Sequence, residues 1–269
     1  MITVDRVRFL LSRRWFLFFG VVVVLAYLAF RLGEWQFDRL SERENRNAVT
    51  AQNLDAAAVP VEDVLAVDRP VAARDEWRRV EARGEYAAEE TVVVRYQTRD
   101  GQAGVDVVTP LRTEDGTALL VNRGWLATGN VGTTRPDLPE PPSGTVTVTG
   151  WVRADATGSA SEVADRSTRA ISSAAIGQTL PFPVYRGFVE LDEEDPAPAE
   201  PLGKVETPDL GEGPHFFYGL QWWFFGALAL FGFGYLVWDE RRRMLRKRAV
   251  DRAVARREAP DRTQQDTRA

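Results

Sequence analysis

The sequence predicts an α+β membrane protein in which two transmembrane helices flank an extracytoplasmic antiparallel β-sheet or small β-barrel domain. Three observations lead to this fold class. Two long stretches without a charged residue lie towards the two ends of the 269-residue chain. Between them lie short segments rich in valine, threonine and aromatic residues, a composition that favours strands. Basic residues gather at both ends and acidic residues in the middle, although the net charge is only −5.

The first uncharged stretch covers residues 16–30, and Trp15 and Gly33 extend it at its two ends. We expect a transmembrane helix over 15–33, because about 20 apolar residues at roughly 1.5 Å each cross the hydrocarbon core. Two arginines precede the stretch and resemble a twin-arginine export signal. The stretch is long and has no small-x-small cleavage pattern near its end, so a retained anchor is favoured.

The second uncharged stretch covers the 23 residues 216–238. As a helix it reaches about 34 Å, enough to cross a hydrocarbon core of roughly 30 Å. Tyr218 and Trp238 lie 20 residues apart, as expected for rings at the two headgroup levels. The sequence therefore predicts a second transmembrane helix over 214–238.

Charge predicts the orientation. Residues 1–14 hold four arginines and one aspartate, and residues 239–269 hold eleven lysines and arginines against six acids. Residues 15–238 hold 19 basic and 32 acidic residues. Basic flanks stay on the cytoplasmic side. We therefore expect a multi-pass plasma-membrane protein with both termini cytoplasmic and the central domain extracytoplasmic.

The basic tail is densest in the sequence ERRRMLRKR at 240–248. Because it directly follows a predicted span, it indicates an electrostatic anchor on membrane lipid rather than a nucleic-acid-binding segment.

A helical extension and connection is expected over 34–75. Residues 33–47 lack turn residues after the initial glycine, so the first helix should continue beyond the membrane. Residues 48–75 are rich in alanine and contain two prolines. They favour an irregular connection with a short helix over 61–67.

The β-domain is expected over 76–213, where the period of the sequence changes. Valine, threonine and aromatic residues partly alternate with polar ones, which is typical of strands in an antiparallel sheet or small barrel. The six predicted strands are 77–86, 91–98, 104–111, 117–126, 145–153 and 184–191.

Turn residues separate these strands. Glu-Asp-Gly at 114–116 predicts a hairpin turn. The Pro- and Gly-rich segment 129–144 predicts a loop, and the Ser- and Ala-rich segment 154–181 a loop with a short helix. Residues 192–203 are acidic and rich in proline, and they predict an extended return towards the membrane.

The residue counts limit the chemistry. The chain has no cysteine and one histidine, His215, which excludes disulfides and thiolate metal sites and leaves too few ligands for a catalytic zinc. It has no nucleophile elbow, P-loop or zinc-protease motif. Its many acidic residues are more typical of a solvated surface than of a paired-carboxylate site. We therefore expect no enzymatic activity and no catalytic residues.

His215 lies where the second apolar stretch begins, directly after Pro214, a residue suited to the first turn of a helix. The partial positive charge of a helix N-terminus disfavours imidazolium, and a neutral ring can bind a metal or accept a hydrogen bond. Tyr218 and Trp222 follow on the same helix face, and Gln221 lies at the same depth. The stripe suits a flat, iron-bearing ligand or a partner helix. It also suits an aromatic belt that holds the helix at its depth, and spacing alone favours the belt.

Several segments together resemble the Surfeit locus 1 family. The three main ones are LGEWQFDR at 32–39, GVDVVTPLRTEDGTALLVNRGWL at 104–126, and PHFFYGLQWWFFG at 214–226. Residues 144–153 and 80–86 look like that family's flanking strands, so the resemblance spans most of 14–238. It implies a non-enzymatic assembly factor for haem-copper cytochrome c oxidase that helps haem a reach, or remain in, the catalytic subunit. Oxidase subunits and the haem a synthase are the protein partners it implies.

The same resemblance implies a transient haem a site. The family's second-span pattern falls on His215, Tyr218, Gln221 and Trp222, with His215 as the metal ligand. Its first-span pattern falls on Gly33, Trp35, Gln36 and Arg39. Its central pattern falls on Thr109, Pro110, Val121, Asn122, Arg123, Gly124 and Trp125. Asparagine often precedes the family histidine, whereas Pro214 stands here and affects the start of the helix.

Physical chemistry suggests roles for these residues. Arg39, Arg123 or Arg95 could pair with haem propionates, because a guanidinium fork matches carboxylate geometry. A turn or sheet salt bridge explains Arg123 equally well. Gly33 is expected to break or bend the first helix. Gly124 should permit a tight backbone, and Trp125 should pack over the sheet or at the membrane.

Two other functions remain open at this point. A pure scaffold would pack its helices against oxidase subunits without a cofactor, and Gly219 and Gly226, seven residues apart, could admit a neighbouring helix. A membrane-anchored envelope enzyme or a regulator of polysaccharide export would share the two-span layout. Normal oxidase activity in a deletion strain would favour this last class.

Overall fold

The computed structural model describes residues 12–129 and 136–258, and the chain divides into two units that we describe separately. One unit holds two long helices and consists of Met1–Glu44 and Glu212–Ala269. The other, Asn45–Gly211, holds the β-strands. Parts of the predicted basic termini and of the 129–144 loop lie outside the described residues.

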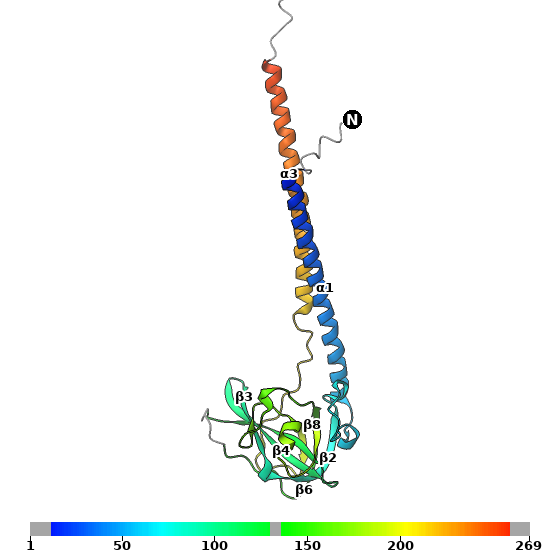
Figure 1. Ribbon diagram of the computed structural model, residues 1–269, viewed down its shortest axis with the longest axis vertical. Coiled ribbons are helices and arrows are strands. Elements are labelled where there is room, and N and C mark those ends of the chain that lie inside the picture. Colours follow the sequence, from blue (N-terminus) through cyan, green and yellow to red (C-terminus); the bar gives the residue numbers. More distant parts are fainter. Residues whose placement is uncertain (1–11, 130–135, 259–269) are drawn as a thin grey trace, which may run out of the picture. The chain divides into compact units, whose positions relative to one another are not determined.

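The helical unit is built from α3 (His215–Glu258) and from α1 (Arg13–Asp55) as far as Glu44. Both helices are long and apolar enough to cross a membrane. The predicted continuation of the first helix past residue 33 is confirmed, because α1 runs without interruption to Asp55. Figure 1 shows α1 and α3 side by side and running in opposite directions.

Aromatic contacts join the two helices along their length. Phe18 lies 5.5 Å from Phe233 near one end of the pair. Trp223 stacks on Phe30, with ring centroids 6.1 Å apart, and lies 4.8 Å from Phe37. Since residue numbers rise on α1 as they fall on α3, these contacts define an antiparallel pair.

Glycines set the spacing between the helices. A Cβ atom on Gly33 would lie 2.2 Å from Cδ1 of Trp223, and one on Gly219 would lie 2.8 Å from the Phe37 ring. Of the predicted break or bend at Gly33, the break is absent, because the helix is continuous there and the glycine makes room for an indole. Gly219 and Gly226, which the scaffold hypothesis offered to a helix of an oxidase subunit, lie against α1 of the same chain instead.

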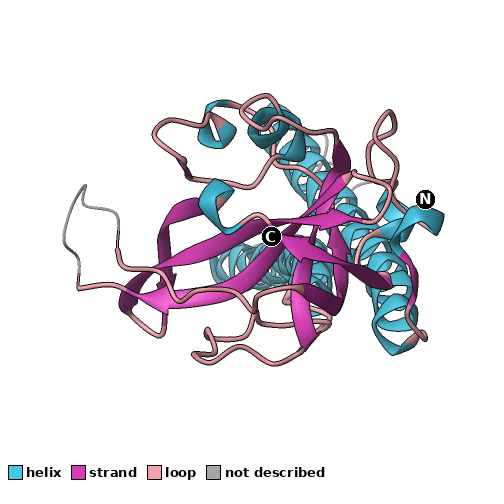
Figure 2. Ribbon diagram, turned by 90° about the horizontal axis from the view of Figure 1, so that it is seen from below, coloured by secondary structure: helices cyan, strands magenta, loops and turns pink. Residues whose placement is uncertain are grey.

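All six predicted strands are present in the second unit, and two two-residue strands accompany them. The strands are β1 (Val59–Pro60), β2 (Arg79–Tyr86), β3 (Val92–Arg99), β4 (Gln102–Thr113), β5 (Ala118–Ala127), β6 (Thr145–Arg153), β7 (Ser167–Thr168) and β8 (Val184–Asp195). Figure 2 shows them as a strongly curved sheet.

The sheet is mixed, so the prediction of a purely antiparallel sheet is wrong. Its order is β1-β2-β6-β8-β5-β4-β3-β7, and β2 also pairs with β4, which closes a ring of β2, β6, β8, β5 and β4. A closed ring with an odd number of strands cannot alternate in direction throughout. The parallel pair in this ring is β5 with β8. The alternative in the prediction, a small barrel, agrees with this closed ring of strands.

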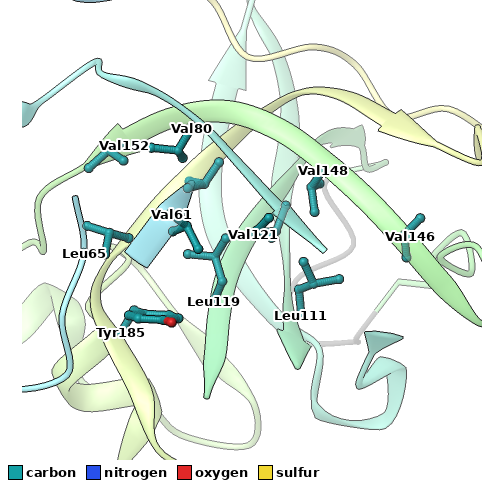
Figure 3. Close-up of a cluster of buried hydrophobic side chains, with 12 residues drawn as sticks. Val61, Leu65, Val80, Leu111, Leu119, Val121, Val146, Val148, Val152 and Tyr185 are labelled. Atoms are coloured by element: carbon teal, nitrogen blue, oxygen red, sulfur yellow. The ribbon is translucent and has the colours of Figure 1, made fainter. Parts of the chain in front are cut away.

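The barrel interior is filled by alternate residues of its strands. On β6, Val146, Val148 and Val152 are buried between more exposed neighbours, as the two-residue period of a strand requires. Figure 3 shows valines and leucines from β2, β4, β5 and β6 gathered into one cluster. A second cluster lies between the sheet and α2 (Ser173–Gly177), whose Ile176 is fully buried.

The connections differ from the predictions in two places. The helix expected over 61–67 is only a 3-10 turn, Val61–Asp63, followed by one i to i+4 hydrogen bond from the Leu65 amide to the Val61 carbonyl; Val61 and Leu65 both point into the barrel. The extended return expected from residue 192 begins only after Asp195, because β8 continues in register with β6. The predicted hairpin turn at 114–116 and the short helix within 154–181 are confirmed. Further 3-10 turns are Ala73–Asp75, Ala88–Glu90 and Ser159–Ser161.

Candidate functional site

His215 is the first residue of α3, as the preceding proline predicted. The chain turns at Gly213, where φ is +69°, a value that favours glycine. The carbonyl of Pro214 then accepts the first helical hydrogen bond, from the amide of Tyr218 at 3.2 Å. The imidazole is therefore held on the first turn of the helix and is only partly buried.

The imidazole contacts the other long helix through one hydrogen bond. Nδ1 of His215 lies 2.8 Å from Oε1 of Gln36 on α1. An amide oxygen can only accept, so Nδ1 carries the proton and donates it to Gln36. In the neutral ring, Nε2 then has a free lone pair and is the atom available to a ligand.

This pairing is the arrangement that orients metal-binding histidines. A ligating histidine usually donates its second ring N–H to a carbonyl or carboxylate, which fixes the tautomer and the plane of the ring. Across the described part of the chain, no group of three or more His, Cys, Asp or Glu side chains could hold a metal ion. A single imidazole therefore fits a metal that brings its other ligands with it, and the iron of a haem is such a metal.

The other second-span residues lie beside His215 without closing a pocket over it. Tyr218 is 49% exposed, and Gln221 is also exposed. Trp222 is half-buried, and its ring packs edge-on against Phe225 at 6.1 Å. At roughly 100° per residue, Tyr218 and Trp222 stay within about 60° of His215 around α3, whereas Gln221 turns further away.

Arg39 lies on α1, one turn beyond Gln36. Its guanidinium pairs with Glu42 at 2.7 Å and lies over the Trp35 ring at 5.7 Å. Both charged side chains are about half exposed, so the pair contributes little to stability. The arginine remains accessible to an anion near the end of α3 that carries His215.

Arg123 is placed in the other unit, on β5, and is buried there. Its guanidinium donates to the carbonyls of Pro139 at 3.0 Å and Glu140 at 3.3 Å, and lies over the Tyr86 ring at 5.6 Å. Burial lowers the pKa of Arg123 from its ordinary value. These contacts hold the proline-rich segment after β5 against the barrel, and they give Arg123 a structural use.

The rest of the central motif is structural. Gly124 has φ +133°, and a Cβ atom there would lie 2.6 Å from the Gly203 carbonyl, so the tight backbone predicted at this glycine is confirmed. Trp125 exchanges two backbone hydrogen bonds of 2.8 Å with Gly203. Its indole donates to the carbonyl of Gln97 and covers Gly104. Of the two positions predicted for Trp125, the structure shows packing over the sheet.

Sequence reasoning missed two features. It placed Gln36 in a motif but assigned it no role. The feature of the sequence that could have indicated a role is a single amide side chain between Trp35 and Phe37 in an otherwise amphipathic helix. It also missed a buried polar cluster on β3, β4, β5 and β8, where Asn122 donates to Glu190 at 2.7 Å and Arg99 to Asp106 at 2.9 Å.

Glu190 is only 6% exposed, and burial raises its pKa to about 7, with Asp106 adding to the effect and Arg153 opposing it. Burial also raises the pKa of Asp106. The sequence signal was a polar residue inside each of three apolar strands. Because the cluster is enclosed, it acts on the stability of the barrel rather than on a ligand.

The helix pair, the closed barrel and the single available imidazole define a class of protein: a barrel domain carried on two candidate membrane-spanning helices, with one oriented histidine at a helix start. Residues 23–227 match the SURF1 family, and the chain belongs to it. Oxidase assembly is the function generally associated with this family.

Curated relatives agree with this assignment. The chain is 30% identical over 250 residues to SURF1-like proteins of Mycobacterium bovis and Mycobacterium tuberculosis, and each alignment covers 91% of both chains. A SURF1-like protein of Dictyostelium discoideum is 25% identical over 114 residues, covering 40% of this chain and 42% of its own.

Proposed function

We propose that the protein is an assembly factor for haem-copper cytochrome c oxidase that assists the insertion or retention of haem a in the catalytic subunit. Membership of the SURF1 family supports the oxidase. The observation that carries the haem a role is the hydrogen bond from His215 to Gln36, which leaves Nε2 as a ligand atom on an exposed helix start. The protein acts by holding a cofactor and not by catalysis.

Several residues of the helical unit would each have a separate role in holding the cofactor. Haem a, when bound, would supply an iron that the imidazole nitrogen of His215 could ligate. Gln36 fixes the proton on Nδ1 of His215 and so presents Nε2. Tyr218 and Trp222 provide ring surface beside the histidine, and Arg39 provides a guanidinium suited to a propionate. The single protein ligand favours transient binding, as a transfer role requires.

The membrane topology is part of this proposal. The two helices cross the plasma membrane, the basic ends lie in the cytoplasm, and the barrel lies outside. The charge distribution supports this, because both flanks are basic and the segment between them carries 32 acids against 19 basic residues. His215 then lies near the outer surface, and the protein partners are oxidase subunits and the haem a synthase.

Purification from cells that make haem a tests the ligand role. We expect haem a absorbance to copurify with the native chain and to be lost in His215→Ala. In Gln36→Leu the affinity for haem a should fall about 10- to 100-fold, which is the usual effect of removing the partner of a ligating histidine. Gln52→Leu is the matched control, since Gln52 is an exposed glutamine further along α1. Pigment that is unchanged by His215→Ala would refute the ligand role. Normal haem a content in membranes of a deletion strain would refute the assembly role.

A scaffold without a cofactor is the second candidate, and one observation favours it. Phe217, Phe224 and Phe231 follow each other at seven-residue spacing on α3 and are 73%, 61% and 74% exposed. They form a row away from the glycines that contact α1, and such a row suits a helix of an oxidase subunit as well as lipid. Copurification of oxidase subunits from a haem-a-producing strain without haem absorbance would select this function.

A further inference from the structure

We infer that the crevice between the start of α1 and the middle of α3 binds one phospholipid with a phosphate and a primary ammonium, of the phosphatidylethanolamine type. The crevice has a volume of about 510 Å³ and lies within the helical unit. Its lining residues are Arg14, Trp15 and Phe18 of α1 and Leu236, Asp239, Glu240 and Arg243 of α3. This inference rests on the membrane insertion proposed above.

The lining changes from apolar to charged along the helix axes. Phe18 and Leu236 lie on the side of the aromatic contacts that join the two helices, where Phe18 meets Phe233. Arg14 and Arg243 lie at the opposite end. The eight residues from Leu236 to Arg243 span about 10 Å, comparable with a headgroup zone of about 5–8 Å on each side of the hydrocarbon core. A bound phospholipid requires this order, because its acyl chain needs apolar side chains and its headgroup needs charged ones.

The crevice is lined by equal numbers of basic and acidic residues, whereas the tail of α3 that follows it is mainly basic. Two guanidinium groups, of Arg14 and Arg243, and two carboxylates, of Asp239 and Glu240, belong to the lining of the crevice. Asp239 and Arg243 also pair with each other at 2.9 Å. A purely anionic headgroup would leave the carboxylates facing a negative charge. A zwitterionic headgroup offers its phosphate to the arginines and its ammonium to the carboxylates.

The ammonium must be a primary one. A carboxylate gains most from an ammonium that donates hydrogen bonds, and –NH₃⁺ has three N–H groups to donate, whereas a trimethylated nitrogen has none. The crevice should therefore discriminate between two zwitterionic lipids that carry the same formal charges. Trp15, half-buried at the margin of the crevice, belongs to the residue type that prefers this depth.

Native mass spectrometry of the full chain in dodecyl maltoside tests the inference. The probes are dioleoyl phosphatidylethanolamine, dioleoyl phosphatidylcholine and dioleoyl phosphatidylglycerol, which share their acyl chains. We expect the first bound lipid to prefer ethanolamine to choline by about fivefold, the scale of a partly exposed ion pair. Equal binding of ethanolamine and choline lipids, or stronger binding of the glycerol lipid, would overturn the inference. This comparison needs no variant.

Two pairs of variants locate the site. Glu240→Gln should remove the preference for ethanolamine, whereas Asp251→Asn, an acid removed further along α3, should keep it. Arg14→Gln should weaken both zwitterionic lipids, whereas Arg241→Gln, outside the crevice, should not. A preference that survives Glu240→Gln would also overturn the inference. Because these measurements use the purified chain and no haem, they stand or fall independently of the oxidase function.

Discussion

Replacing Glu190 by glutamine should change how the stability of the barrel depends on pH. Glu190 is 6% exposed and accepts a hydrogen bond of 2.7 Å from Asn122. Arg99, Asp106 and Arg153 are the charged groups that act on it. Burial raises its pKa from 4.5 to about 7. A glutamine keeps the shape and the hydrogen bond but cannot ionise.

The size of the effect follows from linkage. The folded protein keeps the Glu190 proton at pH values where the unfolded chain has lost it, since the folded-state pKa is the higher one. The contribution of Glu190 to the free energy of unfolding is therefore greatest below about pH 4.5 and is lost as the pH rises to about 7. The full difference corresponds to about 3 kcal/mol, of which about 2–3 kcal/mol falls between pH 5 and pH 8.

This free energy can be measured by urea titration of the full chain in detergent. Pulse proteolysis reports the unfolded fraction at each urea concentration, through the fragments cut from the barrel. The native protein should lose about 2–3 kcal/mol more than Glu190→Gln between pH 5 and pH 8. Glu193→Gln is the control, because Glu193 is exposed on the same strand. Parallel pH profiles for the native protein and Glu190→Gln would refute the reasoning, since the carboxyl would then titrate as an exposed one does.

Two predictions concern glycines. Gly33→Leu should push the two helices apart, at a cost of about 1–3 kcal/mol, whereas Gly20→Leu, with nothing within 4 Å of its Cβ position, should not. In the cysteine-free chain, disulfide yield between cysteines placed at Ala29 and Gly226, whose Cβ positions lie 3.4 Å apart, reports this; equal yields in the two variants would contradict it. Gly124→Ala should destabilise the barrel by about 1–3 kcal/mol, because φ is +133° there. Pulse proteolysis measures the loss, and a midpoint equal to the native one would exclude the strain.

The strands could be predicted because their signal is local. Alternation along β6 and the Glu-Asp-Gly turn after β4 depend on neighbouring residues alone, and both were located within a residue or two. The direction of β8 could not be predicted in this way. It depends on whether the ring closes and on the number of strands in it, which no single segment records.

In the candidate site, too, some features follow from neighbouring residues and others depend on the tertiary structure. The position of His215 at a helix start follows from Pro214 beside it, so the sequence predicts it. The partner of His215 lies 179 residues away in the chain, and only the packing of α1 on α3 brings the two together. The use of Gly33 is likewise invisible locally, because a helical glycine suggests a weak point until the indole of Trp223 is placed against it.

Packing and ligand chemistry are therefore coupled within the helical unit. Gly33 lies one turn from Gln36 on α1, and Gly219 lies one turn from His215 on α3. Both glycines make close contacts with rings of the opposite helix. Since the hydrogen bond between Gln36 and His215 spans the gap that these glycines set, a bulkier residue at either position would lengthen it and release the Nδ1 proton from its acceptor. If His215 holds a cofactor as we propose, the residues that bring the helices together would thus also decide which of its nitrogens faces that cofactor.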